Sequence, residues 1–413
     1  MPTRTLSELY EGKYNEQRKR YEDACVEFIK IYKEKPTRFF SAPGRTEVSG
    51  NHTDHNHGRV IAAAVDLDII ACVCPIDEPV VYLKSEGFPE DKVDLRELSV
   101  IESEKNTSAS LIRGVAKGLV DRGYKIGGFK AYTTSNVLKG SGLSSSAAFE
   151  VLIGTILNEL YNAPHIANPI EIAQIAQYAE NVYFGKPSGL MDQMASSWGG
   201  FITIDFADTN EPEIDGLMFD LAKHNHSLCI VDTKGNHADL TPEYAAIPNE
   251  MKSVAHFFGK DYLREITKDD VLSNIVALRE KCGDRAILRA LHFFEENERV
   301  AELCHFIDTD NFEWFLKYIN ASGNSSYKYL QNVFASSAPD EQGVSLALNV
   351  IERLLDGEGA HRVHGGGFAG TVQAFVPNKM LEKFKAGIEA VFGEGSCYVL
   401  NIRECGGTEV LFN

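Results

Sequence analysis

The segment 138–148, Leu-Lys-Gly-Ser-Gly-Leu-Ser-Ser-Ser-Ala-Ala, has the residue types of a phosphate-binding loop. Its glycines let the backbone bend closely around an anion, because no Cβ blocks the approach. The apolar stretch 149–161 after it predicts a helix, whose first amides and dipole favour negative charge. The alternating stretch 128–134 before it predicts a strand. The candidate phosphate ligands are Gly140, Ser141, Gly142, Leu143, Ser144, Ser145 and Ser146.

This loop differs from the two commonest nucleotide-binding motifs. Lys139 precedes the glycines, whereas a Walker A loop places its lysine after them. The glycine spacing does not fit a dinucleotide-binding fingerprint either. Taken alone, the segment also fits a flexible Gly/Ser connection, so other parts of the chain have to decide.

Three further segments accompany the loop. Residues 43–56 read Pro-Gly-Arg-Thr-Glu-Val-Ser-Gly-Asn-His-Thr-Asp-His-Asn, residues 185–193 read Gly-Lys-Pro-Ser-Gly-Leu-Met-Asp-Gln, and residues 365–370 read Gly-Gly-Gly-Phe-Ala-Gly. In this order and at these spacings, the segments resemble the sugar-binding signature, the Met-Asp-Gln block and the C-terminal glycine turn of the galactokinases, members of the GHMP kinase superfamily. The resemblance runs from residue 41 to residue 372.

The resemblance implies an ATP- and Mg²⁺-dependent sugar 1-kinase with an α+β, two-domain GHMP fold: an N-terminal α/β domain, a C-terminal ferredoxin-like domain and the active site between them. Phosphoryl transfer to a hydroxyl requires a phosphate cradle, a metal ion and a group that orients the hydroxyl. The implied catalytic residues are Asp192 and Arg45, the metal ligands Ser146 and Glu180, the sugar contacts Asn51, His52, Asp54, Gly189 and Tyr244, and the glycine turn Gly365, Gly366, Gly367 and Gly370.

An arginine close to Asp192 would lower the pKa of that carboxyl. A lowered pKa weakens Asp192 as a base but leaves it able to orient the acceptor hydroxyl, which a loose transition state mainly requires. The stretch 170–183 predicts a helix with Glu180 at the edge of its apolar face, where a carboxylate can reach a pocket rim.

Position 51 departs from the galactokinase signature. Asn51 stands where the signature has glutamate, and Glu47 stands where it has asparagine. We expect Asn51 to face C6 of the sugar, where an amide accommodates a hydroxyl as well as a carboxylate. Three hypotheses therefore stay open: a galactose 1-kinase, a kinase for galacturonate or another C6-modified sugar, and a sensor that binds ATP and galactose without turnover.

The histidines around the sugar signature offer an alternative reading as a metal cluster. His52, Asp54, His55 and His57 lie within six residues. Three ligands from one short loop rarely reach tetrahedral geometry, and no Cys pair or His-x-x-x-His pair completes the set. We therefore favour the sugar-binding role.

Length and composition set the remaining expectations. A chain of 413 residues should form two domains, for which we predict residues 1–212 and 213–413. A net charge of −18 argues against nucleic acid or an anionic membrane as a partner, leaving the sugar and ATP. The eight scattered cysteines and the polar start suggest a cytoplasmic protein with reduced thiols, and we expect a monomer. We further expect two strands within 60–74 and separate helices over 284–297 and 301–307.

Overall fold

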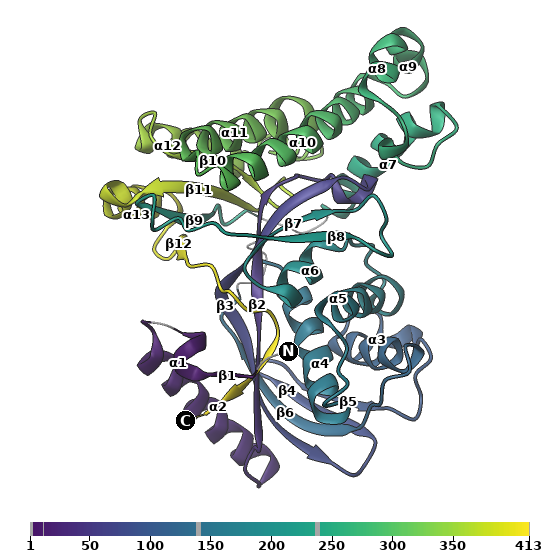
Figure 1. Cartoon of the computed structure of the whole chain (residues 1–413), viewed down its shortest axis with the longest axis vertical. Coiled ribbons are helices and arrows are strands. Elements are labelled where there is room, and N and C mark those ends of the chain that lie inside the picture. The colour runs from purple at the N-terminus through teal and green to yellow at the C-terminus, as the bar shows by residue number, and fades with distance from the viewer. Residues whose placement is uncertain (1–2, 11, 138–141, 236–239, 413) are drawn as a thin grey trace.

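Two long neighbouring strands, β2 (Arg38–Ser49) and β3 (Arg59–Ile76), run up the molecule and connect its lower and upper parts (Figure 1). The computed structural model describes residues 3–10, 12–137, 142–235 and 240–412. The expectation of two strands within 60–74 is wrong. These residues form one continuous strand, β3, whose two halves pair with different neighbouring strands. Residues 59–63 pair with β7 (Phe201–Asp205), and residues 69–76 pair with β6 (Gly128–Ser135).

The pairing of β2 with β3 shifts register between Pro43 and Arg45 and again between Glu47 and Ser49. Such bulges bend a strand and redirect its side chains. Both shifts fall inside the sugar signature, so this part of β2 does not follow a regular pleat.

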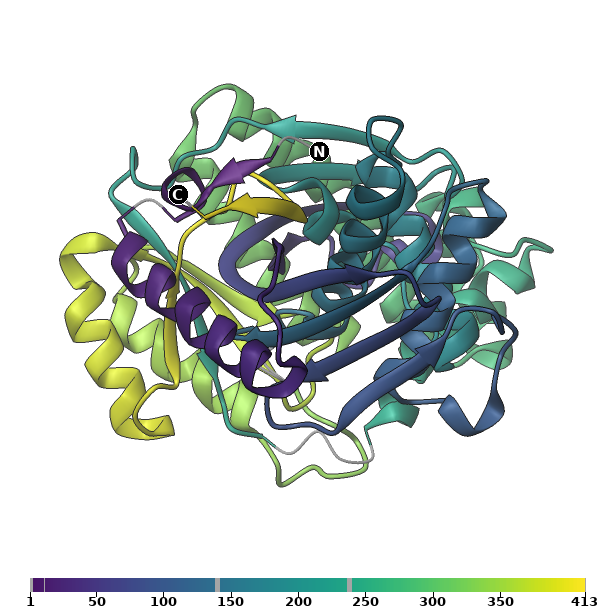
Figure 2. The same cartoon turned by 90° about the horizontal axis from the view of Figure 1, so that it is seen from below.

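The first sheet has the strand order β1-β13-β2-β3-β6-β4-β5, with β7 paired to β3 and β8 paired to β7. Helix α2 lies across one face (Figure 2), and helices α4 and α6 pack on β2 and β3 from the other side. Because both faces are covered, β3 is buried over most of its length. The remaining strands are β1 (Arg4–Thr5), β4 (Val80–Ser85), β5 (Glu90–Asp94), β8 (Glu213–Leu217) and β13 (Thr408–Leu411).

The second sheet is antiparallel, with the order β10-β11-β9-β12. Helices α12 and α13 pack against it, and α11 packs on β10. This mixture of helices and sheets confirms the expected α+β class. The strands are β9 (His226–Asp232), β10 (Ala360–His364), β11 (Thr371–Pro377) and β12 (Cys397–Leu400), and the helices are α11 (Phe312–Ser325), α12 (Gly343–Leu355) and α13 (Leu381–Phe392).

The first sheet extends beyond the expected boundary at residue 212. Strand β8 pairs with β7, and β13 returns from the far end of the chain to pair with β2. The largest hydrophobic cluster also joins side chains of the two sheets, Ala71 and Phe375 among them. A single cut in the sequence therefore does not separate the two sheets.

The remaining helices lie mainly on the first sheet and at the top of the molecule. The expected break near residue 300 is wrong, because no glycine or proline interrupts α10 there. None of the helices in the described ranges combines the length and the continuous apolar character that a membrane span requires. These helices are α1 (Leu6–Leu9), α2 (Tyr14–Tyr32), α3 (Ser108–Asp121), α4 (Ser145–Tyr161), α5 (Pro169–Tyr178), α6 (Met191–Trp198), α7 (Thr241–Phe257), α8 (Lys268–Ser273), α9 (Ile275–Lys281) and α10 (Asp284–Asp308).

The helix expected over 170–183 changes character before its end. Asn168 and Glu171 cap the start of α5 reciprocally, at 3.0 and 2.9 Å. From Ala179 to Phe184 the chain forms a π-helical turn, η3, in which the Gly185 amide donates to the Glu180 carbonyl five residues back, at 3.0 Å. Such turns are frequent at functional sites, and Glu180 lies within this one.

Candidate active site

Asp192 lies in the first turn of α6, and its carboxylate is held from two sides. Arg45 Nε donates to Oδ1 at 2.7 Å, and Ser144 Oγ donates to Oδ2 at 2.7 Å. Arg45 also donates to the Gly142 carbonyl. The arginine of the sugar signature therefore joins the candidate catalytic aspartate to the phosphate loop.

The surroundings keep Asp192 ionised. Burial by itself would raise the pKa of this carboxyl, but the Arg45 charge and the hydrogen bonds from Arg45 and Ser144 outweigh that effect and lower the pKa below its ordinary value of 3.8. Its side chain keeps 28% exposure, so an acceptor hydroxyl can still reach it. This geometry suits an orienting anion better than a strong base.

The phosphate loop enters α4 through an unusual backbone conformation. Ser144 adopts left-handed angles, φ 55° and ψ 65°, and its hydroxyl binds Asp192 instead of capping α4. Gly142 has φ +71°, and a Cβ there would lie 2.9 Å from Thr371 Oγ1 and 3.0 Å from His364 Nδ1. The turn therefore requires glycine at 142 and packs against the second sheet. Two predicted ligands, Gly140 and Ser141, lie outside the described residues.

The other predicted loop residues occupy the start of α4. Leu143 is buried, and its carbonyl accepts the Arg45 amide at 3.0 Å. Ser145 and Ser146 open the helix. Because Ser144 caps none of the first amides, the helix N-terminus keeps donors for an anion.

The two predicted metal ligands lie together. Ser146 Oγ donates to Glu180 Oε1 at 3.1 Å, although the two residues are 34 positions apart in the sequence. Lys186 Nζ donates to the same oxygen at 3.0 Å. Hydroxyl and carboxylate oxygens are the ligands that Mg²⁺ prefers, so this pair fits that ion.

Lys186 is a functional candidate that the sequence reasoning did not single out. Its side chain is 60% exposed, and burial of its amine is outweighed by Glu180 and Asp192, which raise its pKa. An exposed cation beside Glu180 and Asp192 can contact a transferring phosphoryl group. The sequence could have pointed to Lys186 as a functional residue because it lies within the 185–193 block, beside the other residues of that motif.

A second buried carboxyl lies behind Glu180. Gln193 Nε2 donates to Glu180 Oε2 at 2.8 Å and to Glu150 Oε2 at 3.2 Å. Glu150 is fully buried, its Oε1 has no hydrogen-bond partner within the described part of the chain, and burial, followed by the Glu180 charge, raises its pKa well above 4.5. The sequence signal was a Glu flanked by apolar residues in a predicted helix, one turn after Ser146.

Asp54 and Gly189 are in direct contact across the site. A Cβ at residue 189 would lie 1.8 Å from Asp54 Oδ2, so only glycine leaves room for the carboxylate. Asp54 Oδ1 accepts the His55 amide at 2.9 Å, which fixes the orientation of the group. The sugar signature and the 185–193 block therefore meet at these two residues.

His52 and Tyr244 approach the glycine turn from different elements. Burial lowers the pKa of His52 to about 3, so its ring is neutral and donates Nε2–H to the Gly366 carbonyl at 3.1 Å. The Tyr244 hydroxyl donates to the Gly367 carbonyl at 3.1 Å, and burial raises its pKa to about 12. Both side chains therefore border one surface of the turn.

The glycine turn joins β10 to β11. Gly365 and Gly367 have φ values of 62° and 82°, and a Cβ at Gly367 would lie 2.0 Å from the Asn332 carbonyl oxygen. The Gly370 carbonyl accepts from Thr233 Oγ1 at 2.7 Å. The turn therefore exposes carbonyl groups rather than side chains to the sugar signature.

Asn51 does not have the position expected from the sequence. Its side chain is completely buried. Its Nδ2 donates to Glu47 Oε1 at 3.0 Å and to the Gly365 carbonyl at 2.7 Å, while its Oδ1 accepts from Asn332 at 2.9 Å and from Ser326 at 3.2 Å. The amide is fully engaged by protein groups and has no free edge for a sugar hydroxyl or carboxylate, which corrects the expectation that it faces C6.

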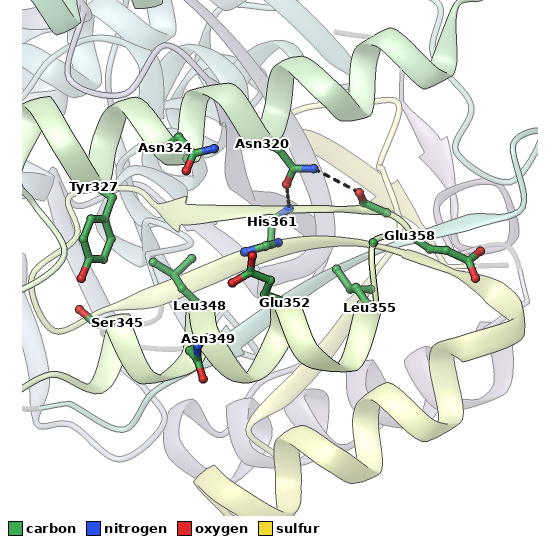
Figure 3. Close-up of a pocket in the computed structure, with 13 residues that line it drawn as sticks. Asn320, Asn324, Tyr327, Ser345, Leu348, Asn349, Glu352, Leu355, Glu358 and His361 are labelled. Carbon is green, nitrogen blue, oxygen red and sulfur yellow. Dashed lines mark hydrogen bonds between the residues drawn. The ribbon is translucent and has the colours of Figure 1, made fainter.

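One pocket lies away from these residues. It has a volume of about 500 Å³ and is bordered by α11, α12 and β10 (Figure 3). Its lining includes His361 but none of the predicted site residues.

The alternative metal cluster finds no support in the described ranges, where no group of three His, Cys, Asp or Glu side chains could hold a metal. The His57 ring instead stacks on Tyr262, with 3.7 Å between the ring centroids.

Comparisons with known proteins match the two motif regions and the whole fold. Residues 26–75 match the galactokinase galactose-binding signature, and residues 110–200 match the N-terminal domain of GHMP kinases. A Lactococcus lactis galactokinase solved with galactose has a TM-score of 0.80 at 25% identity, over 94% of this chain and 99% of that one. A Streptococcus pneumoniae phosphomevalonate kinase, at 12% identity and a TM-score of 0.61, shares the fold alone.

Two curated relatives decide the family. A galactokinase from Streptomyces coelicolor is 30% identical over 88% of this chain and 91% of its own length. A galactokinase from Clostridium tetani is 31% identical over 87% and 89%. With this similarity along nearly its whole length, and with Arg45, Ser144 and Asp192 assembled at one point, the chain belongs to the galactokinase family of the GHMP kinases.

Proposed function

We propose that this chain transfers the γ-phosphoryl group of ATP to the C1 hydroxyl of galactose. The observation that carries the proposal is the position of Asp192, held by Arg45 from the sugar signature and by Ser144 from the phosphate loop. One carboxylate therefore borders both the expected sugar position and the expected phosphate position. Phosphoryl transfer requires this proximity, because the acceptor oxygen and phosphorus must approach in line.

In this reaction the C1 oxygen forms the new bond to phosphorus while the bond from phosphorus to the ADP oxygen breaks. Once the new bond has formed, the proton of the C1 hydroxyl passes to the Asp192 carboxylate, which releases it to water. Asp192 accepts a hydrogen bond from the C1 hydroxyl and orients its lone pair. Arg45 keeps Asp192 ionised and stabilises negative charge on the transferring group, with Lys186 as a second cation. Asp54 and His52 bind sugar hydroxyls, Gly189 leaves room for Asp54, and Tyr244 borders the sugar from the facing side.

The amides at the start of α4 and the serines of the phosphate loop hold the phosphates. Ser146 and Glu180 would hold Mg²⁺, which neutralises charge on the phosphate oxygens. The 3.1 Å separation of their oxygens supports this assignment. Since every residue named comes from one chain, we also propose that the monomer is active, and the free state of the eight cysteines supports the cytoplasm as its compartment.

The direct test is ADP release measured with galactose, galacturonate, N-acetylgalactosamine and arabinose, with ³¹P NMR to identify the sugar phosphate. We expect galactose 1-phosphate and the highest kcat/KM for galactose. Asp192→Asn keeps the size of the side chain and should lower kcat about 10²- to 10³-fold, the usual effect of removing one preorganised charged group. A higher kcat/KM for another sugar would overturn the substrate, and an unchanged kcat in Asp192→Asn would overturn the role of that residue.

A further inference from the structure

A buried polar network joins the sugar signature to the second sheet. Arg362 of β10 is completely buried. It donates to the Glu47 carboxylate at 2.6 Å and to the Val48 carbonyl at 2.8 Å. Gln373 of β11 donates to the Glu47 carbonyl at 2.9 Å. The bulged part of β2 is therefore held by the side of the second sheet that faces it.

Asn51 extends this network to the glycine turn. Its Nδ2 binds Glu47 and the Gly365 carbonyl at the same time. The next residue, His52, donates to the carbonyl of Gly366, the next residue of the turn. Two consecutive residues of the signature are thus joined to two consecutive residues of the turn.

The acceptor side of Asn51 is tied to a different element. Ser326 and Asn332, at the end of α11 and beyond it, donate to Oδ1. The Asn51 carbonyl also lies 3.0 Å from His292 Nε2 on α10. Position 51 therefore joins three elements of the upper part of the molecule, and a displacement here would be passed to His52 and Asp54.

We propose that Asn51 and Glu47 are positioning residues that lock the sugar signature to the glycine turn. The Asn51 amide faces the Glu47 carboxylate, whose negative charge is also paired with Arg362. Asn51 acts on the sugar only through His52 and Asp54. The kinetic part of this proposal rests on the proposed galactokinase activity, whereas the stability part does not.

Isosteric variants test the pair. Asn51→Asp replaces the donor by an anion beside Glu47 and the Gly365 carbonyl, and Glu47→Gln removes the negative charge. In the double variant the charge has moved from 47 to 51, so the hydrogen bond can re-form in the opposite direction. We expect Asn51→Asp to lower the free energy of unfolding, measured in urea. The unfolding equilibrium constant of the double variant should be smaller, by about tenfold or more, than the value predicted by adding the effects of the two single variants. Additive effects would overturn the pairing.

Kinetics distinguish positioning from sugar contact. Galactose and 6-deoxygalactose differ only at O6. If Asn51 acts by positioning, Asn51→Asp raises KM for both sugars by the same factor, about tenfold, and the double variant lowers it again. A changed ratio between the two sugars would mean that Asn51 touches O6 and would overturn the proposal. If the enzyme turns over neither sugar, the proposed function fails, and the stability cycle still decides the pairing.

Glu104→Gln is the matched control for Glu47→Gln. Glu104 pairs at 2.7 Å with Arg113, a buried arginine that likewise donates to backbone carbonyls, at the edge of the first sheet. We expect this variant to lose stability without a change in the KM for galactose. If Asn51→Asp does not fold, Ser326→Ala removes only the 3.2 Å bond to Oδ1 and should shift KM for both sugars in the same direction by a smaller factor. The proposal would be overturned if the folded Ser326→Ala protein and Glu47→Gln both kept the wild-type KM for galactose and 6-deoxygalactose.

Discussion

Gly189→Ala should damage sugar binding by displacing the Asp54 carboxylate. The added Cβ would lie 1.8 Å from Asp54 Oδ2, and contacts of a Cβ below 3.0 Å are essentially absent from proteins. The carboxylate therefore has to move by at least about 1.2 Å. The backbone at 189 needs no left-handed conformation, so the effect is confined to this contact. A misplacement of about 1 Å at a site can cost about 10²-fold in rate.

We therefore expect kcat/KM for galactose to fall about 10²-fold, which corresponds to about 2.7 kcal/mol. The dissociation constant of a fluorescent ATP analogue should stay within about twofold, because the atoms nearest to the added Cβ belong to Asp54 and not to the phosphate loop. Gly216→Ala is the control, since a Cβ there meets no atom within 4 Å. If Gly189→Ala kept more than a third of the wild-type kcat/KM, Asp54 would not be the sugar ligand inferred here.

Three further predictions concern the charged groups of the site. Ser146→Ala and Glu180→Gln should each raise the Mg²⁺ concentration for half-maximal activity several-fold, because Mg²⁺ tolerates little loss of its oxygen ligands; titrations that superimpose on the wild type would remove the metal assignment. The pKa of Glu150 is raised in the folded state, so the folded protein binds this proton more tightly than the unfolded chain does. Its contribution to the free energy of unfolding is therefore present below its ordinary pKa of 4.5 and is lost as the pH rises through the folded pKa. Glu150→Gln should therefore flatten the fall in stability above about pH 4.5, as measured by thermal unfolding across pH, and an unchanged slope would contradict this. The pKa of Asp192 is lowered, so its contribution to the free energy of unfolding is present above pH 3.8 and is lost as the pH falls below that value. The profile of kcat against pH should show no titration of Asp192 between about pH 5 and 9. A slope in that range that disappears in Asp192→Asn would refute this prediction.

The local sequence was sufficient to predict the parts of the site that depend on backbone freedom and helix ends. The glycines at 142, 365 and 367 marked turns because left-handed backbone angles disfavour other residues. The strand before the phosphate loop and the helix after it followed from apolar periodicity, which depends on neighbours a few residues away. The long helix α10 and the continuous β3 were divided wrongly, because a sequence pattern does not show which neighbouring elements bury each part.

The pairings across the chain were decided only by the tertiary structure. Motif resemblance named Arg45, Asp192, Ser146 and Glu180, but their contacts form between residues up to 147 positions apart. The same holds for Asn51, whose motif position suggested an open sugar contact. Its side chain bonds Ser326, Asn332 and Gly365, all more than 270 residues away, and is completely buried. A sequence shows which groups are present, whereas burial and hydrogen-bond partners, and through them pKa and availability to a ligand, are set by the elements that pack around each group.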